Sequence, residues 1–215
     1  MAKKEKVLEI IKKLKKVYPN PKIELDFKNP YQLLIATILS AQATDVSVNL
    51  ATPGLFKKYP KPDDLAKAPV SEIDQYIKNI NFHNNKASLI KRCAQMLIAE
   101  FDGKVPDNME DLDSLPGVAR KSANVVLGSV FHKAEGIVVD THIIRMSNKL
   151  GLTNSKDPVQ IEKDLMEIVP KEYWIDFPLM LILHGRHFCT ARPHSCENCP
   201  LEELCPDFSP SLRGT

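Results

Sequence analysis

Apolar residues recur at helical spacing along most of this chain. Between residues 7 and 17 they form one stripe with lysines on the opposite face, and Pro19 ends this first helix. Pro30 can begin a second helix that is apolar on every side. Alternating apolar and polar residues occur only at 136–139, too few to build a sheet, so we predict an all-α protein. Further helices are predicted at 45–58, 71–79, 84–100, 120–131, 141–150, 157–168 and 171–184.

The length of the chain and the distribution of its charges limit the classes of protein to which it can belong. With 215 residues, 43% of them hydrophobic, the chain can bury one core or two small ones. It has no run of 18 apolar residues, so no membrane partner is expected. Residues 1–22 hold eight Lys and two Glu, which a solvated helix face explains most simply. The same charged N-terminus has no apolar signal core and indicates a reducing, cytoplasmic location.

Four of the five cysteines lie within 17 residues, as Cys189-x6-Cys196-x2-Cys199-x5-Cys205. Four gathered thiolates need a soft cation or a cluster to balance their charge. A reducing cytosol disfavours disulfides, and structural zinc prefers two tight C-x2–4-C pairs. An iron–sulfur cubane accepts one cysteine per iron from a longer loop. Spacing alone therefore puts the cluster only slightly ahead of zinc.

A predicted turn between two helices is the second candidate site. One helix ends near Leu112, Pro116-Gly117 makes the turn, and the next helix begins near Ala119. Unpaired N–H groups at a helix N-terminus form an anion site, and Gly117 permits a positive φ and close approach of a phosphate. A Pro-Gly turn before a helix is also common in purely structural contexts, so the turn alone identifies no function.

Lys121 and Asp140 are candidate reactive groups. Lys121 lies in the first turn of the helix after the hairpin, where most lysines are solvated bystanders. A lysine nucleophile must be uncharged, so we expect Lys121 to be buried in a cleft. Asp140 precedes another predicted helix, and we expect it to cap that helix and to react. Direct contact with an ionised Asp140 would keep the amine protonated, so Asp140 should lie outside salt-bridge range.

Together these motifs resemble the endonuclease III family of DNA glycosylases, within the helix-hairpin-helix superfamily, over nearly the whole chain. The residues that carry the resemblance are Leu39-Ser40-Ala41-Gln42-Ala43-Thr44-Asp45, the hairpin with Lys121, Val139-Asp140-Thr141-His142, His184-Gly185 and the four-cysteine tail.

The resemblance implies two helical domains flanking a DNA-binding cleft. Residues 23–132 would form a continuous helical domain with the helix-hairpin-helix at about 108–131. Residues 1–22 and 133–215 would form the second domain, where Cys189, Cys196, Cys199 and Cys205 hold a 4Fe–4S cluster. The protein would be a cytoplasmic, nucleoid-associated monomer whose partner is double-stranded DNA with damaged pyrimidines or abasic sites.

The resemblance also implies a reaction. A damaged pyrimidine would be flipped out of the duplex, and neutral Lys121 would attack C1′ of its sugar and expel the base. The resulting imine would undergo β-elimination and break the strand. Asp140 would accept a proton transiently or stabilise positive charge on the sugar.

Other residues would contact the DNA. Gln42 would fill the gap left by the extruded nucleotide. Phe82 would be an apolar wedge, although burial preference alone makes it a core residue. The family's usual glycine, tyrosine and second hairpin glycine appear here as Asn81, His83 and Ala119. The remaining expected contacts to the DNA backbone are Leu115, Gly117, Val118, Ala119, Arg186 and Arg192, with His194 beside them.

Three alternatives remain open. The chain can be a non-catalytic helix-hairpin-helix and iron–sulfur module that only binds DNA, a monofunctional glycosylase, or a zinc-ribbon scaffold. A pure binding module has no need of a lysine and an aspartate at 121 and 140, so this pair favours the enzyme.

Overall fold

The computed structural model describes residues 2–192 and 194–208. Every regular element among these residues is a helix, which confirms the predicted all-α class. Residues 136–139 form irregular chain in place of the short extended segment suggested by their pattern. None of the described helices is both long enough and apolar enough to cross a bilayer.

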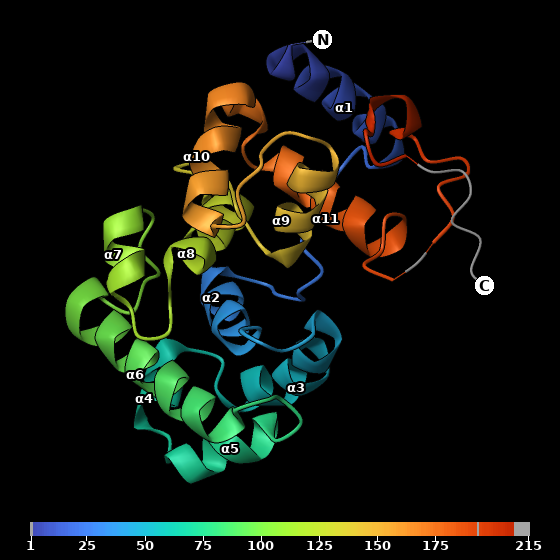
Figure 1. Ribbon diagram of the computed structural model, residues 1–215. Coiled ribbons are helices and arrows are strands. Elements are labelled where there is room, and N and C mark those ends of the chain that lie inside the picture. The colour runs from blue at the N-terminus through green and yellow to red at the C-terminus, as the bar shows by residue number, and fades with distance from the viewer. Residues whose placement is uncertain (1, 193, 209–215) are drawn as a thin grey trace. The chain divides into compact units, whose positions relative to one another are not determined.

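The chain forms two compact units (Figure 1). One consists of Glu24–Lys133, and the other joins Met1–Ile23 to Ala134–Thr215. These divisions lie one residue away from the domain boundaries expected at 23–132. The assignment of the second unit as an iron–sulfur domain stays a prediction.

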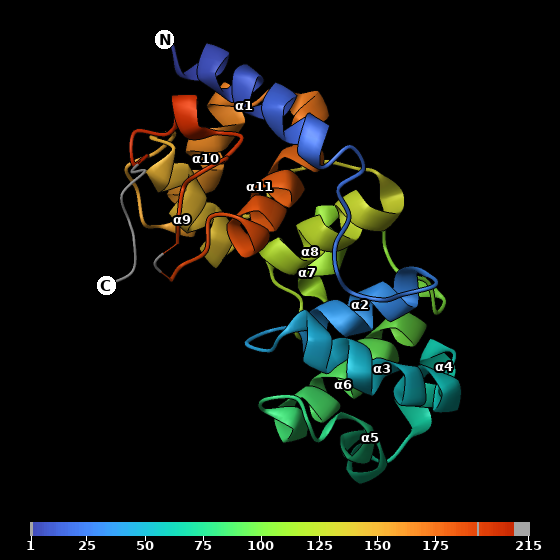
Figure 2. The same ribbon diagram turned by 90° about the vertical axis from the view of Figure 1, so that its right-hand side faces the viewer.

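The unit of residues 24–133 is built around α2 and α6. Pro30 opens α2, the side chain of Asn29 caps it, and most of its residues are buried. The short helices α4 and α5 both pack along α6, as the two views in Figures 1 and 2 agree. The helices of this unit are α2 (Pro30–Leu39), α3 (Asp45–Lys58), α4 (Pro62–Lys67), α5 (Val70–Ile77), α6 (His83–Phe101), α7 (Met109–Ser114) and α8 (Arg120–Val126), with a π-helical turn at Leu127–Phe131.

The other unit packs the first helix of the chain against the last ones. The apolar stripe of α1 shares a core with residues of α9, α10 and α11. Leu201 and Leu204, which lie between the last cysteines, enter the same core, so the cysteine loop is held by apolar burial. The helices are α1 (Lys3–Val17), α9 (Thr141–Lys149), α10 (Pro158–Ile168) and α11 (Asp176–His187), with 3₁₀ turns at Lys171–Tyr173 and Glu202–Leu204.

The predicted helix at 171–184 was placed wrongly. Only Lys171–Tyr173 forms a 3₁₀ turn there, and α11 runs from Asp176 to His187. Pro178 explains the shift, because proline has no N–H and blocks a helix interior but fits its first turn. Starting at Asp176 places Pro178 in that first turn.

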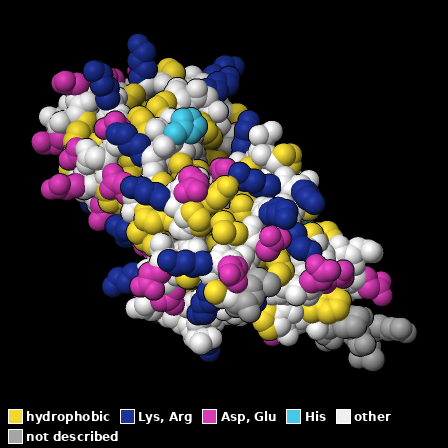
Figure 3. Space-filling view, turned by 90° about the horizontal axis from the view of Figure 1, so that it is seen from above, with side chains coloured by type: hydrophobic (Ala, Val, Ile, Leu, Met, Phe, Trp, Pro, Cys, Tyr) yellow, Lys and Arg dark blue, Asp and Glu magenta, His cyan; other side chains and the backbone are white. Residues whose placement is uncertain are grey.

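The lysines of α1 lie on the side of the helix that faces solvent. Lys13 pairs with Glu203 at 2.7 Å, and Lys12 pairs with Glu9 at 3.6 Å. In the view of Figure 3, Lys and Arg side chains are interspersed with Asp and Glu, so this face shows no continuous basic field. The Lys13 pair also attaches the cysteine loop to α1.

Candidate functional site

The hairpin between α7 and α8 has the geometry expected from its sequence. The N–H of Val118 donates to the carbonyl of Leu115 at 3.0 Å and closes the turn. Gly117 has φ 83°, and a Cβ at this position would lie 3.0 Å from Cγ2 of Ile38 in α2. Glycine is therefore needed here both for its backbone conformation and for the close approach to α2.

The four hairpin residues predicted to contact DNA differ in what they present. Gly117 and Ala119 are exposed, so their backbones are accessible. The side chains of Leu115 and Val118 are buried, which leaves only their backbones for any contact. Because the N–H of Val118 already closes the turn, Val118 shapes the hairpin and does not offer a donor from its backbone.

Lys121 is the second residue of α8 and lies in the first turn of the helix that follows the hairpin turn. Its side chain is exposed, so the expected burial of the amine is absent in the protein alone. The reason is its position: the first two residues of α8 are exposed, and the buried positions begin at Ala123. Any desolvation of this amine must come from what binds there.

Asp140 caps α9, as its sequence predicted. A carboxylate oxygen accepts from the N–H of Ile143 at 2.9 Å, and the residue is half-buried. His142 follows two residues later. Its pKa is lowered mainly by burial and further by Arg186 and Arg145, while Asp140 opposes that shift. Asp140 belongs to the unit of α9 and Lys121 belongs to the other unit.

Gln42 and Phe82 have the same unusual backbone conformation and lie in the same unit. Both are left-handed, with φ of 53° and 59°, and both side chains are exposed. Phe82 is 61% exposed, so the expectation from general burial preference was wrong for this aromatic residue. The side-chain amide of Asn81 donates to the carbonyl of Gln42 at 3.1 Å and joins the two turns.

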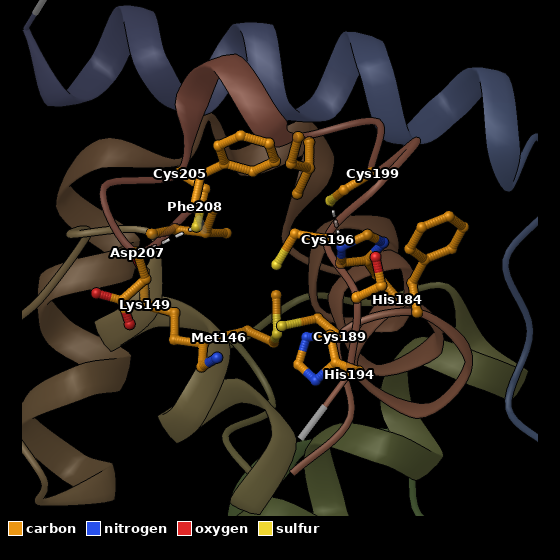
Figure 4. Close-up of a pocket in the computed structure, with 14 residues that line it drawn as sticks. Met146, Lys149, His184, Cys189, His194, Cys196, Cys199, Cys205, Asp207 and Phe208 are labelled. Carbon is orange, nitrogen blue, oxygen red and sulfur yellow. Dashed lines mark hydrogen bonds between the residues drawn. The ribbon is translucent and has the colours of Figure 1, made fainter. Parts of the chain in front are cut away.

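The four cysteines of the tail line one pocket (Figure 4). None is in a disulfide, and their sulfur atoms face a common space in the unit of α9. Burial raises the pKa of Cys189, Cys199 and Cys205, because the charged thiolate loses its solvation, and repulsion from neighbouring cysteines raises it further. This donor set fits a cationic iron–sulfur group.

Across residues 2–192 and 194–208, no group of three or more His, Cys, Asp or Glu side chains is already arranged to hold a metal ion. Four cysteine thiolates are a ligand set for zinc as well as for an iron–sulfur cluster.

His184 in α11 forms one wall of this pocket. It is 1% exposed, and its Nε2 lies 3.7 Å from Sγ of Cys199. Burial lowers the pKa of His184 to about 4, so the ring is neutral near pH 7. A neutral imidazole with its proton on Nε2 can donate to a thiolate sulfur.

Arg145 connects α9 to the start of the cysteine loop. Its Nη1 donates to the carbonyl of Cys189 at 3.0 Å and its Nη2 donates to the carbonyl of Gly185 at 2.8 Å. A Cβ on Gly185 would lie 3.1 Å from Nη2 of Arg145, so glycine makes room for this contact. The helix that Asp140 caps is thereby tied to the cysteine loop.

The two arginines predicted to contact phosphates differ in exposure. Arg192 is exposed, and its carbonyl accepts from Oγ1 of Thr190 at 3.2 Å and from Nδ1 of His194 at 2.8 Å. Arg186 is half-buried in the last turn of α11. Arg192 is therefore the more accessible of the two.

Sequence reasoning missed Lys86, which is 4% exposed and donates through Nζ to the carbonyl of Leu39 at 2.9 Å. The sequence nevertheless contained a pattern that indicates this residue. Lys86 falls on the buried stripe of α6, in helical register with Ile90, Ala94 and Leu97. A lysine at an apolar position of a helix indicates a buried amine with a specific acceptor. Burial lowers the pKa of Lys86.

This chain is similar to known proteins in sequence. Residues 35–171 match the model of the HhH-GPD superfamily base excision DNA repair proteins. Endonuclease III of Synechocystis sp. is 47% identical over 210 residues, covering 98% of this chain and 96% of that protein. Endonuclease III of Escherichia coli K12 is 43% identical over 202 residues, covering 94% and 95%.

Solved structures agree. A trapped endonuclease III–DNA covalent intermediate superposes with a TM-score of 0.89 at 40% identity, covering 96% of this chain and 97% of that one. A thermostable thymine-DNA glycosylase superposes with a TM-score of 0.81 at 26% identity, covering 94% and 96%. The chain therefore belongs to the HhH-GPD superfamily of base excision DNA repair proteins and, within it, to the endonuclease III family.

Proposed function

We propose that this base excision repair enzyme, a DNA glycosylase and abasic-site lyase, acts on oxidised pyrimidines in double-stranded DNA with Lys121 as its nucleophile. One observation carries the proposal: Lys121 is an exposed amine directly after the hairpin, on the unit that also presents Gln42 and Phe82. The endonuclease III of 40% identity has been trapped in a covalent intermediate with DNA, and such an intermediate requires a nucleophile.

The steps follow from amine chemistry. The lone pair of neutral Lys121 attacks C1′ of the extruded sugar, and the bond from C1′ to the base breaks. The base leaves with that electron pair and takes up a proton. The amine loses its proton, the sugar ring opens at O4′, and an imine forms between C1′ and Nζ. Removal of a 2′ proton then expels the 3′ phosphate, and water releases the lysine.

Asp140 is the proposed group that handles the protons. Its carboxylate is fixed by the bond to Ile143, so its orientation is set before DNA arrives. It accepts the proton that Lys121 loses, or it stabilises positive charge on the sugar. Because Lys121 is exposed in the free protein, bound duplex must supply the desolvation that favours the neutral amine.

DNA binding is proposed to use three kinds of contact. The backbones of Gly117 and Ala119 face a phosphate, and Arg192 adds a charge-assisted contact from the other unit. Gln42 fills the space of the extruded nucleotide and Phe82 enters the stack as a wedge. Both side chains are exposed, as insertion requires.

The four cysteines are proposed to hold a 4Fe–4S cluster. When bound, the cluster neutralises the buried thiolates and fixes the loop that carries Arg192. Neither base release nor β-elimination consumes an electron, so the steps above need no redox change. His184 supports the proposal as a neutral donor beside Cys199.

Replacing Lys121 with alanine should abolish covalent capture. Wild-type protein incubated with a thymine glycol duplex and borohydride should form a reduced adduct, and Lys121→Ala should lower both adduct and strand cleavage by about a thousandfold or more. Lys104→Ala, which changes an exposed lysine of the same unit, is the control and should cleave normally. Base release by the wild type without any adduct would instead indicate a monofunctional glycosylase.

Asp140→Asn should separate capping from catalysis. Asparagine caps helices well, so thermal stability and DNA affinity should change little, whereas single-turnover cleavage should slow by about 10²–10⁴-fold. Asp157→Asn is a matched control, because Asp157 caps α10 through a bond of the same length to Gln160. Equal losses of affinity and rate in Asp140→Asn would make Asp140 only a cap.

Purified protein should contain about four irons and four acid-labile sulfides per chain. Cys199→Ser should lose most of this iron and lower the melting temperature, because binding of the group is coupled to folding of the loop. Cys93→Ala, a change in the other unit, should keep the iron. Colourless protein containing zinc, or unchanged melting of Cys199→Ser, would contradict the proposed cluster.

A further inference from the structure

Gln42 and Phe82, here called the probe pair, are held in a strained conformation. A left-handed backbone is unfavourable for a residue with a Cβ and persists only where its surroundings enforce it. Asp102 and His132 are also left-handed, but they terminate helices, where this conformation is common. Asn198 is left-handed as well, and asparagine adopts this conformation more readily than glutamine or phenylalanine. Neither member of the probe pair terminates a helix in this way, so other contacts must hold both residues.

Three side-chain hydrogen bonds provide those contacts. The amide of Asn79 donates to the carbonyl of Ser47 at 3.1 Å, and the amide of Asn81 donates to the carbonyl of Gln42 at 3.1 Å. Nζ of Lys86 donates to the carbonyl of Leu39 at 2.9 Å. All three donors lie in residues 79–86 around Phe82, and all three acceptors lie in residues 39–47 around Gln42. The turn that contains Phe82 is therefore bonded to the turn that contains Gln42 by residues before and after Phe82 in the sequence.

Lys86 is the strongest of these ties. Lys86 lies one helical turn after Phe82, and its backbone N–H donates to the carbonyl of Phe82 at 3.0 Å. Its ammonium group is buried against the C-terminus of α2, where unsatisfied carbonyls carry partial negative charge. A buried amine that loses this acceptor would be strongly unfavourable, so the contact is kept whenever the unit is folded.

The start of α6 is anchored from the opposite side as well. Nδ1 of His83 lies 2.5 Å from Oδ1 of Asp74 in α5. Phe82 thus stands between a contact to α5 and two contacts to the Gln42 turn. Little freedom remains for its backbone to move independently of Gln42.

We propose that Asn81 and Lys86 are positioning residues that couple Gln42 and Phe82 into one rigid probe, so that the two side chains enter the duplex together. The inference rests on the proposed function, because the probe pair must contact DNA. Two turns that move independently would each lose backbone freedom on insertion, whereas two turns bonded to each other are ordered beforehand. Coupling should matter most where a paired, stacked base must be displaced.

The side chain of Asn81 provides the direct bond to the Gln42 turn. Glycine has no side chain to reach the carbonyl of Gln42, so Asn81→Gly should loosen the probe without removing either inserted side chain.

The test compares two duplexes that contain the same thymine glycol. In the first it lies opposite adenine, and in the second the opposite nucleotide is missing, so no partner base must be displaced. Asn81→Ala should slow single-turnover cleavage of the paired duplex by about five- to tenfold, the loss expected from one hydrogen bond. On the gapped duplex its rate should stay within about twofold of wild type.

Asn49→Ala is the matched control. The amide of Asn49 also donates to a backbone carbonyl, that of Glu24 at 2.7 Å, and Asn49 accepts from the N–H of Asp26 at 2.9 Å. These bonds lie in the same unit but do not join the two probe turns. Asn49→Ala should leave the ratio of the rates on the two duplexes unchanged.

A double-mutant cycle isolates the coupling. The loss caused by Asn81→Ala should shrink to less than about twofold in a Gln42→Ala background, where one half of the probe is absent. Lys86→Met should give a larger loss on the paired duplex. If Lys86→Met does not fold, Asn79→Ala replaces it and should behave like Asn81→Ala.

Fluorescence of 2-aminopurine placed opposite the lesion reports base displacement without cleavage. Wild-type protein should raise it on binding, and Asn81→Ala should raise it less at saturating protein. Equal losses on paired and gapped duplexes, no loss on either, or an unchanged fluorescence response would overturn the coupling. A wild type that displaces the base but never cleaves would instead contradict the proposed function and leave the fluorescence test of coupling intact.

Discussion

The ends of helices leave backbone donors and acceptors without partners, and satisfying those groups orients several of the residues to which we assign a role. Asp140 is oriented by the N–H of Ile143 at the start of α9. Arg145 binds carbonyls at the end of α11, and Lys86 binds one at the end of α2. An all-α fold with short connections offers many such ends, so reactive and DNA-contacting side chains can be held firmly outside regular structure.

The two units carry different parts of the proposed chemistry. The unit of residues 24–133 carries the hairpin, Lys121 and the probe pair. The other unit carries Asp140 and the four cysteines, and Arg145 joins α9 to Cys189 within it. The cysteine loop is therefore hydrogen-bonded to the helix that Asp140 caps. A cluster there can support the reaction through position alone, without electron transfer.

Local patterns in the sequence predicted the helical class, the hairpin and the cap at Asp140, because each depends on residues close together in the chain. Pro178 shows the limit of such patterns. The apolar pattern at 171–184 predicted one helix with Pro178 in its interior, but the helix begins at Asp176, so that Pro178 lies in its first turn. Lys86, Asn81 and Arg145 act on carbonyls 39 to 47 residues away in the sequence. Those contacts depend on tertiary packing, although a lysine on the apolar stripe of α6 already indicated one of them.

The identity of the residue that becomes bonded to DNA tests the central claim most directly. Protein captured by borohydride on an abasic duplex can be digested, and the modified peptide sequenced by mass spectrometry. The expected result is a single modified amine at Nζ of Lys121. Modification at another lysine or at the N-terminal amine, with Lys121 unmodified, would contradict the assignment of the nucleophile.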